Sequence, residues 1–235
     1  MIKVGLLRLV LIISIVGIIY SSYYIITYIN EYRVSEKKYE EIETIYHQNE
    51  GDPNEELKRI NEDFVGWIEV DGTEIQYPVV QAVDNDYYLT RNFHQEEDKV
   101  GAIFMDYRNS TDRLDSHTII YGHNMKDDSM FGSLSNVLDA DFSDDNTINL
   151  EFQGETYQWE VFSGYVTKET DWMQVDFDST NNSYLPFLQG LKDKSNVIFS
   201  REEVTKEDKI LTLATCTSHD IDERVIVHAR LIEGD

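Results

Sequence analysis

One cysteine, Cys216, stands at the end of a predicted strand, 210–216, and polar residues follow it. Alternation along the strand places Leu211, Leu213 and Thr215 on one face and Cys216 on the other. If the leucines point into a core, the thiol points away from it, at a strand end that opens into a loop, where functional side chains concentrate. A buried, inert cysteine is the alternative, because a lone cysteine is an unspecific signal.

A thiol nucleophile needs a base or a cationic partner, and histidine is the usual one. Among six histidines, His123 has the position that best mirrors Cys216, because it closes a predicted strand and follows Gly122, which frees the strand end. His219 and His228 stay open as alternatives. The other three lie in a predicted helix or in acid-rich segments typical of surface loops: His47, His94 and His117.

Arg224 begins the last predicted strand, 224–231. If this strand pairs with the one that ends at Cys216, the turn between them places Arg224 opposite the thiol. Its guanidinium would then be able to donate hydrogen bonds to the oxygen of a tetrahedral acyl intermediate. A surface salt bridge with Asp222 or Glu223 explains the same arginine equally well.

The elements that must hold these side chains are mostly strands. Alternating or apolar runs predict strands at 65–70, 73–80, 102–105, 118–121, 148–152, 157–166, 197–199, 210–216 and 225–231. Helices are predicted at 36–48, from 52 to about 60, around 129–138 and at 183–192. Asp71-Gly72 and the segment 153–155 are hairpin signals. The pattern indicates a closed or nearly closed β-barrel with helices set into its loops.

Residues 9–29 form an uncharged, largely apolar run of 21 residues, long enough to cross the hydrocarbon core of a membrane as a helix. Lys3 and Arg8 precede it, so the positive-inside rule places the N-terminus in the cytoplasm and the rest outside. A signal peptide would have a shorter apolar region, and no small-x-small cleavage site precedes the tyrosine-rich end of this one, which favours an uncleaved anchor. We expect an anchor at 1–30, a helical lead-in at 31–61 and a catalytic domain at 62–235.

The segment outside the membrane is strongly acidic. All 45 Asp and Glu residues follow Asn30, whereas two of the 20 basic residues, Lys3 and Arg8, precede it. The segment 31–235 therefore has 18 basic and 45 acidic residues and a formal charge of −27. Such a domain repels nucleic acid and anionic membrane surfaces, so no nucleic-acid partner is expected. The charge is otherwise compatible with almost any function.

Several motifs, in order along the chain, resemble the sortase family and more narrowly its class B. The sortase motif TLxTC reads Thr212-Leu213-Ala214-Thr215-Cys216 here, after Tyr121-Gly122-His123-Asn124-Met125 and 130–134 and before Arg224. Further matching segments are 63–68, 77–81, 85–89 and 101–106. The resemblance implies a mainly β fold: a closed barrel of about eight strands, with N-terminal helices and a helix inserted between the sixth and seventh strands.

The resemblance also implies a cysteine transpeptidase that needs neither a metal nor another cofactor. The thiolate of Cys216 would attack the Thr carbonyl of a sorting signal, His123 would protonate the departing amine, and Arg224 would steady the oxyanion or hold the peptide. An amine of the cell-wall precursor would then resolve the thioacyl enzyme. Class B signals resemble Asn-Pro-x-Thr-Asn or Asn-Pro-x-Thr-Gly and are carried by surface proteins.

Four further residues are expected to contact the bound peptide: Asn124, Thr215, Thr217 and Ser218. The alternatives are a pilin-polymerising sortase, a hydrolytic cysteine protease and a non-catalytic, acidic envelope module. Papain-like enzymes place Cys before His, and L,D-transpeptidases place Arg two residues after Cys, so both fit poorly. The acidic pairs Asp127-Asp128 and Asp144-Asp145 lack the alternating carboxylates of calcium loops, which weakens the module reading.

Overall fold

The computed structural model describes residues 2–48, 51–139, 142, 147–175, 183–195, 203–216 and 223–234, and at 2–4, 6, 7, 216, 233 and 234 it describes only the backbone. The chain forms two compact units, residues 1–41 and 42–235. Helix α1 (Ile2–Gln48) has an exposed apolar part and is long and apolar enough to cross a membrane. The sequence predicts separate helices at 9–29 and 36–48. The structure has one helix instead, because no glycine or proline interrupts the residues between them.

The end of α1 and the short helix α2 (Pro53–Ile60) belong to the second unit. The side chain of Asp52 caps α2, accepting a hydrogen bond from the backbone N–H of Asn54 at 2.9 Å. Tyr46, near the end of α1, stacks on Trp67 with ring centroids 4.0 Å apart. This contact fastens the last turn of α1 to the first strand of the barrel.

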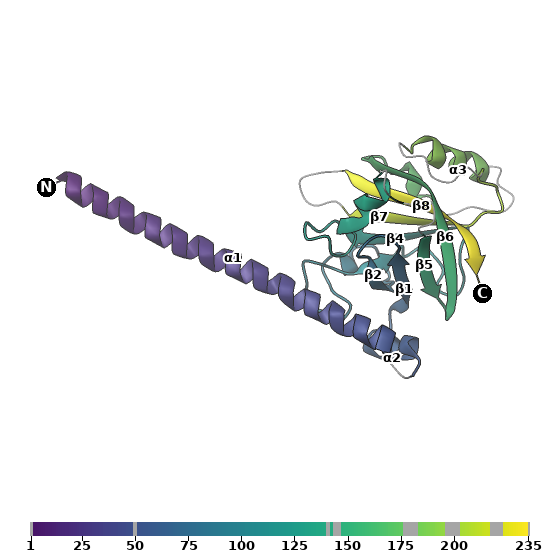
Figure 1. The fold of residues 1–235 in the computed structure, drawn as a ribbon, viewed down its shortest axis with the longest axis horizontal. Coiled ribbons are helices and arrows are strands. Elements are labelled where there is room, and N and C mark those ends of the chain that lie inside the picture. The colour runs from purple at the N-terminus through teal and green to yellow at the C-terminus, as the bar shows by residue number, and fades with distance from the viewer. Residues whose placement is uncertain are drawn as a thin grey trace. The chain divides into compact units, whose positions relative to one another are not determined.

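Eight strands in the described part of the chain close into a barrel in the order β1-β2-β3-β4-β7-β8-β6-β5 (Figure 1). They are β1 (Phe64–Val70), β2 (Gln76–Val80), β3 (Ile103–Met105), β4 (His117–His123), β5 (Thr147–Phe152), β6 (Glu155–Thr167), β7 (Ile210–Cys216) and β8 (Arg224–Gly234). Strands β2 and β3 pair in parallel, as do β4 and β7, and the other neighbours are antiparallel. The predicted closed barrel is confirmed, while the predicted strand at 197–199 lies outside the described residues.

The turns follow the sequence signals. Gln153 and Gly154 both have positive φ, 56° and 78°, and join β5 to β6 by a two-residue hairpin. Short 3-10 helices stand in three loops: η1 (Tyr87–Leu89), η2 (Gly132–Leu138) and η3 (Asp171–Met173). The helix predicted around 129–138 corresponds to η2.

Helix α3 (Tyr184–Asp193) is inserted between β6 and β7, as predicted, and lies outside the barrel (Figure 1). The hydroxyl of Ser163 on β6 donates to the carbonyl of Leu191 at 2.6 Å, and the ring of Phe187 lies 5.5 Å from that of His117 on β4. Alternation along β7 places Thr212 on the same face as Cys216, away from the barrel interior. It pairs with His228, on the face that α3 helps to cover, and is therefore completely buried.

Candidate active site

The strand register brings the three predicted catalytic residues to one end of three neighbouring strands. Strands β4 and β7 run in parallel, and their last aligned pair is His123 with Cys216. Strands β7 and β8 are antiparallel with Ala214 opposite Ile226, so the same register continued by two residues sets Cys216 opposite Arg224. Directly opposed residues of neighbouring strands share a face of the sheet. The orientation of the thiol itself stays a prediction.

His123 is half-buried, and its ring is held by backbone. Its Nε2 lies 2.6 Å from the carbonyl oxygen of Leu89, at the end of η1. A carbonyl oxygen can only accept, so Nε2 carries the hydrogen in the neutral ring. Nδ1 is therefore the ring nitrogen without a hydrogen in the neutral ring.

Gly101 lies against the ring of His123. It has a positive φ of 66°, and a Cβ placed on it would lie 2.8 Å from Cδ2 of His123, 2.8 Å from the carbonyl oxygen of Tyr88 and 3.0 Å from that of Leu89. All three distances are shorter than ordinary van der Waals contacts. A glycine is required here by the backbone conformation and by the closeness of the imidazole.

Arg224 is partly exposed at the start of β8. Its guanidinium carbon lies 5.9 Å from the centroid of the Trp172 ring. The carboxylate of Glu223, one of the two salt-bridge partners considered from the sequence, lies instead 4.0 Å from the ammonium of Lys168. The other, Asp222, lies outside the described residues.

The four predicted peptide contacts differ in their surroundings. Asn124 is exposed just after β4, and its backbone forms a bridge with Met130. Thr215 is buried, and its hydroxyl accepts a hydrogen bond from the N–H of Val225 at 2.9 Å, which ties β7 to β8. This burial leaves Thr215 little surface to offer a peptide. Thr217 and Ser218 lie outside the described residues.

Of the two alternative histidines, His228 has other partners and His219 is not described by the structure. His228 is completely buried and bonds the hydroxyls of Thr212 at 2.7 Å and Tyr165 at 2.9 Å. Burial, followed by the nearby charges of His117 and Lys194, lowers its pKa well below the ordinary value. A neutral ring occupied on both nitrogens is a poor base for a distant thiol. His219 lies outside the described residues.

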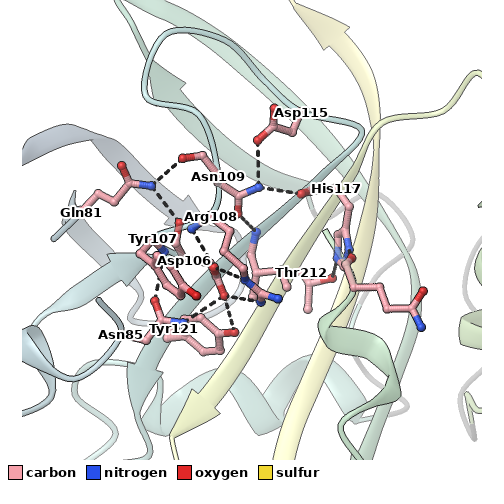
Figure 2. A network of polar contacts seen from close by, with 12 residues as sticks. Gln81, Asn85, Asp106, Tyr107, Arg108, Asn109, Asp115, His117, Tyr121 and Thr212 are labelled. Carbon is pink, nitrogen blue, oxygen red and sulfur yellow. Dashed lines mark hydrogen bonds and ion pairs between the residues drawn. The ribbon is translucent and has the colours of Figure 1, made fainter. Parts of the chain in front are cut away.

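A buried carboxylate organises the loops beside β4 (Figure 2). Asp106 accepts hydrogen bonds from Nε and Nη2 of Arg108 at 2.8 and 2.7 Å, from Tyr121 at 2.9 Å and from Asn85 at 3.0 Å. Burial alone would raise the pKa of Asp106, but these hydrogen bonds, led by those from Arg108, outweigh it and lower the pKa. Asp106 is therefore an ionised, fully paired group at neutral pH.

This network also fixes the segment that carries Leu89. The side chain of Asn85 accepts from the N–H of Tyr107 at 3.0 Å, and Gln81 donates to the carbonyls of Asp106 and Asn109 at 2.8 Å each (Figure 2). The loop before η1 is thus bound to the loop after β3. Sequence reasoning included Asn85 and Asp106 only as members of matching segments and assigned them no role.

Comparison with known proteins agrees with this geometry. The sequence matches the Sortase domain family over residues 68–232. Sortase B of Listeria monocytogenes is 40% identical over 181 residues, covering 75% of this chain and 73% of that protein. Sortase B of Staphylococcus aureus is 36% identical over 239 residues, covering 97% of each.

Solved structures agree as well. The crystal structure of sortase B from B. anthracis in complex with AAEK1 has a TM-score of 0.79 at 38% identity, covering 87% of this chain and 99% of that one. A Staphylococcus aureus sortase B–substrate complex has a TM-score of 0.78 at 35% identity, covering 86% and 98%. The chain belongs to the sortase family of cysteine transpeptidases. Within that family it is a class B sortase.

Proposed function

We propose that this sortase cleaves a C-terminal sorting signal of the type Asn-Pro-x-Thr-Asn or Asn-Pro-x-Thr-Gly after Thr. The acyl group then passes to an amine of the cell-wall precursor. The observation that carries the proposal is the parallel register that sets His123 beside Cys216 at the ends of β4 and β7. Sortases are cell-surface enzymes that act on surface proteins bearing sorting signals and on an amine nucleophile.

The first half of the reaction forms a thioester. The Cys216 thiolate attacks the Thr carbonyl carbon, and the carbonyl electrons move to oxygen, where Arg224 donates hydrogen bonds to the oxyanion. As the intermediate collapses, the C–N bond breaks and the departing amine takes a proton from Nδ1 of His123. The hydrogen bond from Nε2 to Leu89 supports this assignment, because it leaves Nδ1 free to exchange the proton.

The second half reverses these roles. An acceptor amine attacks the thioester carbon and gives a proton to Nδ1 of His123. The C–S bond then breaks and regenerates the Cys216 thiolate. We assign peptide contacts to Asn124, which is exposed beside His123, and to Thr217 and Ser218, and we give Thr215 the supporting role that its bond to β8 indicates.

The proposal includes the membrane topology. Residues 1–30 form a single anchor with a cytoplasmic N-terminus, 31–61 lead out of the membrane, and 62–235 form the extracellular catalytic domain. The exposed apolar part of α1 supports the anchor. Lys3 and Arg8, which precede the apolar run, support the orientation.

The test uses the full chain in detergent micelles with peptides containing Asn-Pro-x-Thr-Asn, Asn-Pro-x-Thr-Gly or Leu-Pro-x-Thr-Gly and a small amine acceptor. We expect cleavage after Thr in the Asn-Pro peptides, a product that contains the acceptor, and no cleavage by Cys216→Ala. Cleavage by Cys216→Ala, or preference for the Leu-Pro peptide, would contradict the proposal. Release of free acid without acceptor incorporation would indicate a hydrolase.

A further inference from the structure

The indole of Trp172 lies beside the guanidinium of Arg224. Trp172 is in η3, in the connection between β6 and α3, and is completely buried. The distance of 5.9 Å between the guanidinium carbon and the ring centroid is within the range of about 6 Å for a cation–π contact. Across the residues that the structure describes, no carboxylate forms an ion pair with Arg224.

This type of contact suits an arginine that must act on an oxyanion. An ion pair occupies the N–H groups of a guanidinium, which all lie in its plane. Packing against an aromatic ring restrains the group and leaves those donors free for the substrate. An arginine side chain also has many rotamers, so a restraint before the reaction lowers the entropy cost of aiming it.

Trp172 is itself held on several sides. Its Nε1 donates to the carbonyl of Glu169 at 2.7 Å, and its ring centroid lies 6.3 Å from that of Tyr121 on β4. Tyr121 is fixed in turn by its hydrogen bond to Asp106. These contacts restrict rotation of the indole, so the surface it presents to Arg224 is constant.

The end of the α3 insertion clamps the same segment. Lys194, which caps α3, lies 2.9 Å from the carboxylate of Glu169 and 2.6 Å from that of Asp171, on either side of the start of η3. Burial would lower the pKa of Lys194, but its hydrogen bonds to Asp171 and Glu169 outweigh this and raise it. The ammonium therefore stays charged at neutral pH and keeps η3 attached to α3.

We propose that Trp172 is a positioning residue that holds the guanidinium of Arg224 toward Cys216, and that Lys194 keeps Trp172 in place from the insertion. The inference rests on the role proposed above for Arg224. It adds that the β6–α3 connection, 52 residues before Arg224 in the sequence, takes part in transition-state stabilisation through that arginine.

The test is a double-mutant cycle on the full chain in detergent micelles, measured as kcat and KM for the best-cleaved peptide. Trp172→Leu should lower kcat about three- to thirtyfold, the size of a partly desolvated cation–π contact. Trp172→Phe, which keeps an aromatic face, should recover most of that loss. In an Arg224→Ala background, Trp172→Leu should cost less than twofold, because the group it restrains is gone.

Trp159→Leu is the matched control, because Trp159 is also completely buried but lies on β6 opposite Leu231 and Ile148. Its effect on kcat should be the same in both backgrounds. Lys194→Met is a second variant that leaves Trp172 intact, and it should cause a smaller loss that also vanishes without Arg224. Thermal melting establishes that each variant is folded at the assay temperature.

The outcomes separate this inference from the proposed function. Equal losses from Trp172→Leu with and without Arg224 would overturn the positioning role and leave Arg224 as an oxyanion donor. A near-normal kcat for Arg224→Ala would overturn both. If Trp172→Leu fails to fold, the cycle with Lys194→Met decides, and a loss that is the same with and without Arg224 would overturn the inference.

Discussion

His123 takes its orientation from the backbone carbonyl of Leu89. Nε2–H is a donor in both the neutral ring and the imidazolium, so this bond persists through both protonation states. The ring therefore needs no flip between taking a proton from one amine and giving it to another. A carbonyl also adds no formal charge beside the imidazole, unlike the carboxylate that orients histidine in many hydrolases.

At this scale we predict that Gly101→Ala lowers kcat by about 10- to 100-fold, the cost typical of a small displacement of a catalytic group. The added methyl would lie 2.8 Å from both Cδ2 of His123 and the carbonyl oxygen of Tyr88, so the imidazole must shift, away from its bond to Leu89. Gly154→Ala is the matched control, because Gly154 also has a positive φ, 78°, but nothing lies within 4 Å of its added Cβ.

Kinetics and long-range ¹H–¹⁵N NMR of the full chain in micelles check this prediction. The wild-type chain and Gly154→Ala should both show the Nε2–H tautomer of His123 and should have similar kcat values. Gly101→Ala should have a lower kcat and should no longer show this tautomer as the only one. The expected strain of the positive φ, about 1 kcal/mol, is common to the two variants. Equal kcat values for them would mean that the space beside His123 has no catalytic role.

At the scale of elements, local patterns predicted the strands, the 153–154 hairpin and α3. What they missed is contact between distant segments. Gly122 was interpreted as freeing the end of β4, but a Cβ on it would lie 2.4 Å from Cδ1 of Ile103 and 2.8 Å from Cγ of Phe131. The glycine permits close packing of β3 and η2 on β4. No local pattern indicated the role of Trp172 either, because its partner Arg224 lies far along the chain, on β8.

The attachment of α3 leads to a prediction about stability. The single hydrogen of the Tyr184 hydroxyl is shared between the carbonyls of Ser116 at 2.6 Å and Asp208 at 2.8 Å, just before β4 and β7 begin. Tyr184→Phe removes this shared donor, while Ser116 keeps its bond from the N–H of Ile210, and should reduce the free energy of unfolding by about 0.5–1.5 kcal/mol. The active-site ends of these strands lie about 20 Å away, six residues along β4. We therefore expect kcat to change less than twofold.

Urea unfolding and peptide cleavage by the full chain in micelles measure the two effects separately. Tyr157→Phe is the control, because its hydroxyl bonds Glu155 at the surface and its loss should change stability by less than about 0.5 kcal/mol. A large fall in kcat for Tyr184→Phe with unchanged unfolding would show that α3 acts on the reaction and is not only a packed cover.

At the scale of the whole molecule, composition indicated an acidic surface but not which polar residues are buried in the interior. His117 was expected in a surface loop because acidic residues precede it. It begins β4, is completely buried, and bonds the carbonyl of Gln174 and the hydroxyl of Thr212. The same hydroxyl meets His228, so two neutral histidines share one buried hydrogen-bond chain. A local stretch of sequence cannot show these hydrogen bonds, because they join residues of three different strands, β4, β7 and β8.

These two histidines predict that the protein loses stability in mild acid. Burial lowers the pKa of His117 to about 4, despite the hydrogen bond to Gln174, and holds that of His228 well below its ordinary value. The unfolded chain binds these protons near pH 6.5, whereas the folded chain does not. Stability is therefore full above about pH 6.5 and falls as the pH drops towards 4. Each histidine contributes a slope of up to about 1.4 kcal/mol per pH unit.

Urea unfolding of the full chain in micelles between pH 7.5 and 5 should show this slope, with a combined limit of about 2.8 kcal/mol per pH unit. His117→Asn keeps an amide donor but cannot take up a proton, so it should remove roughly half of the slope even if it lowers stability at pH 7. His94→Asn, at a half-buried histidine, is the matched substitution against which the loss of slope in His117→Asn is compared. Asp106 does not add to the slope in this window, since its pKa lies below the ordinary value and the group stays ionised. A flat free energy of unfolding between pH 7.5 and 5 would mean that the buried histidines are protonated in the folded protein, and that the chain through Thr212 carries a charge.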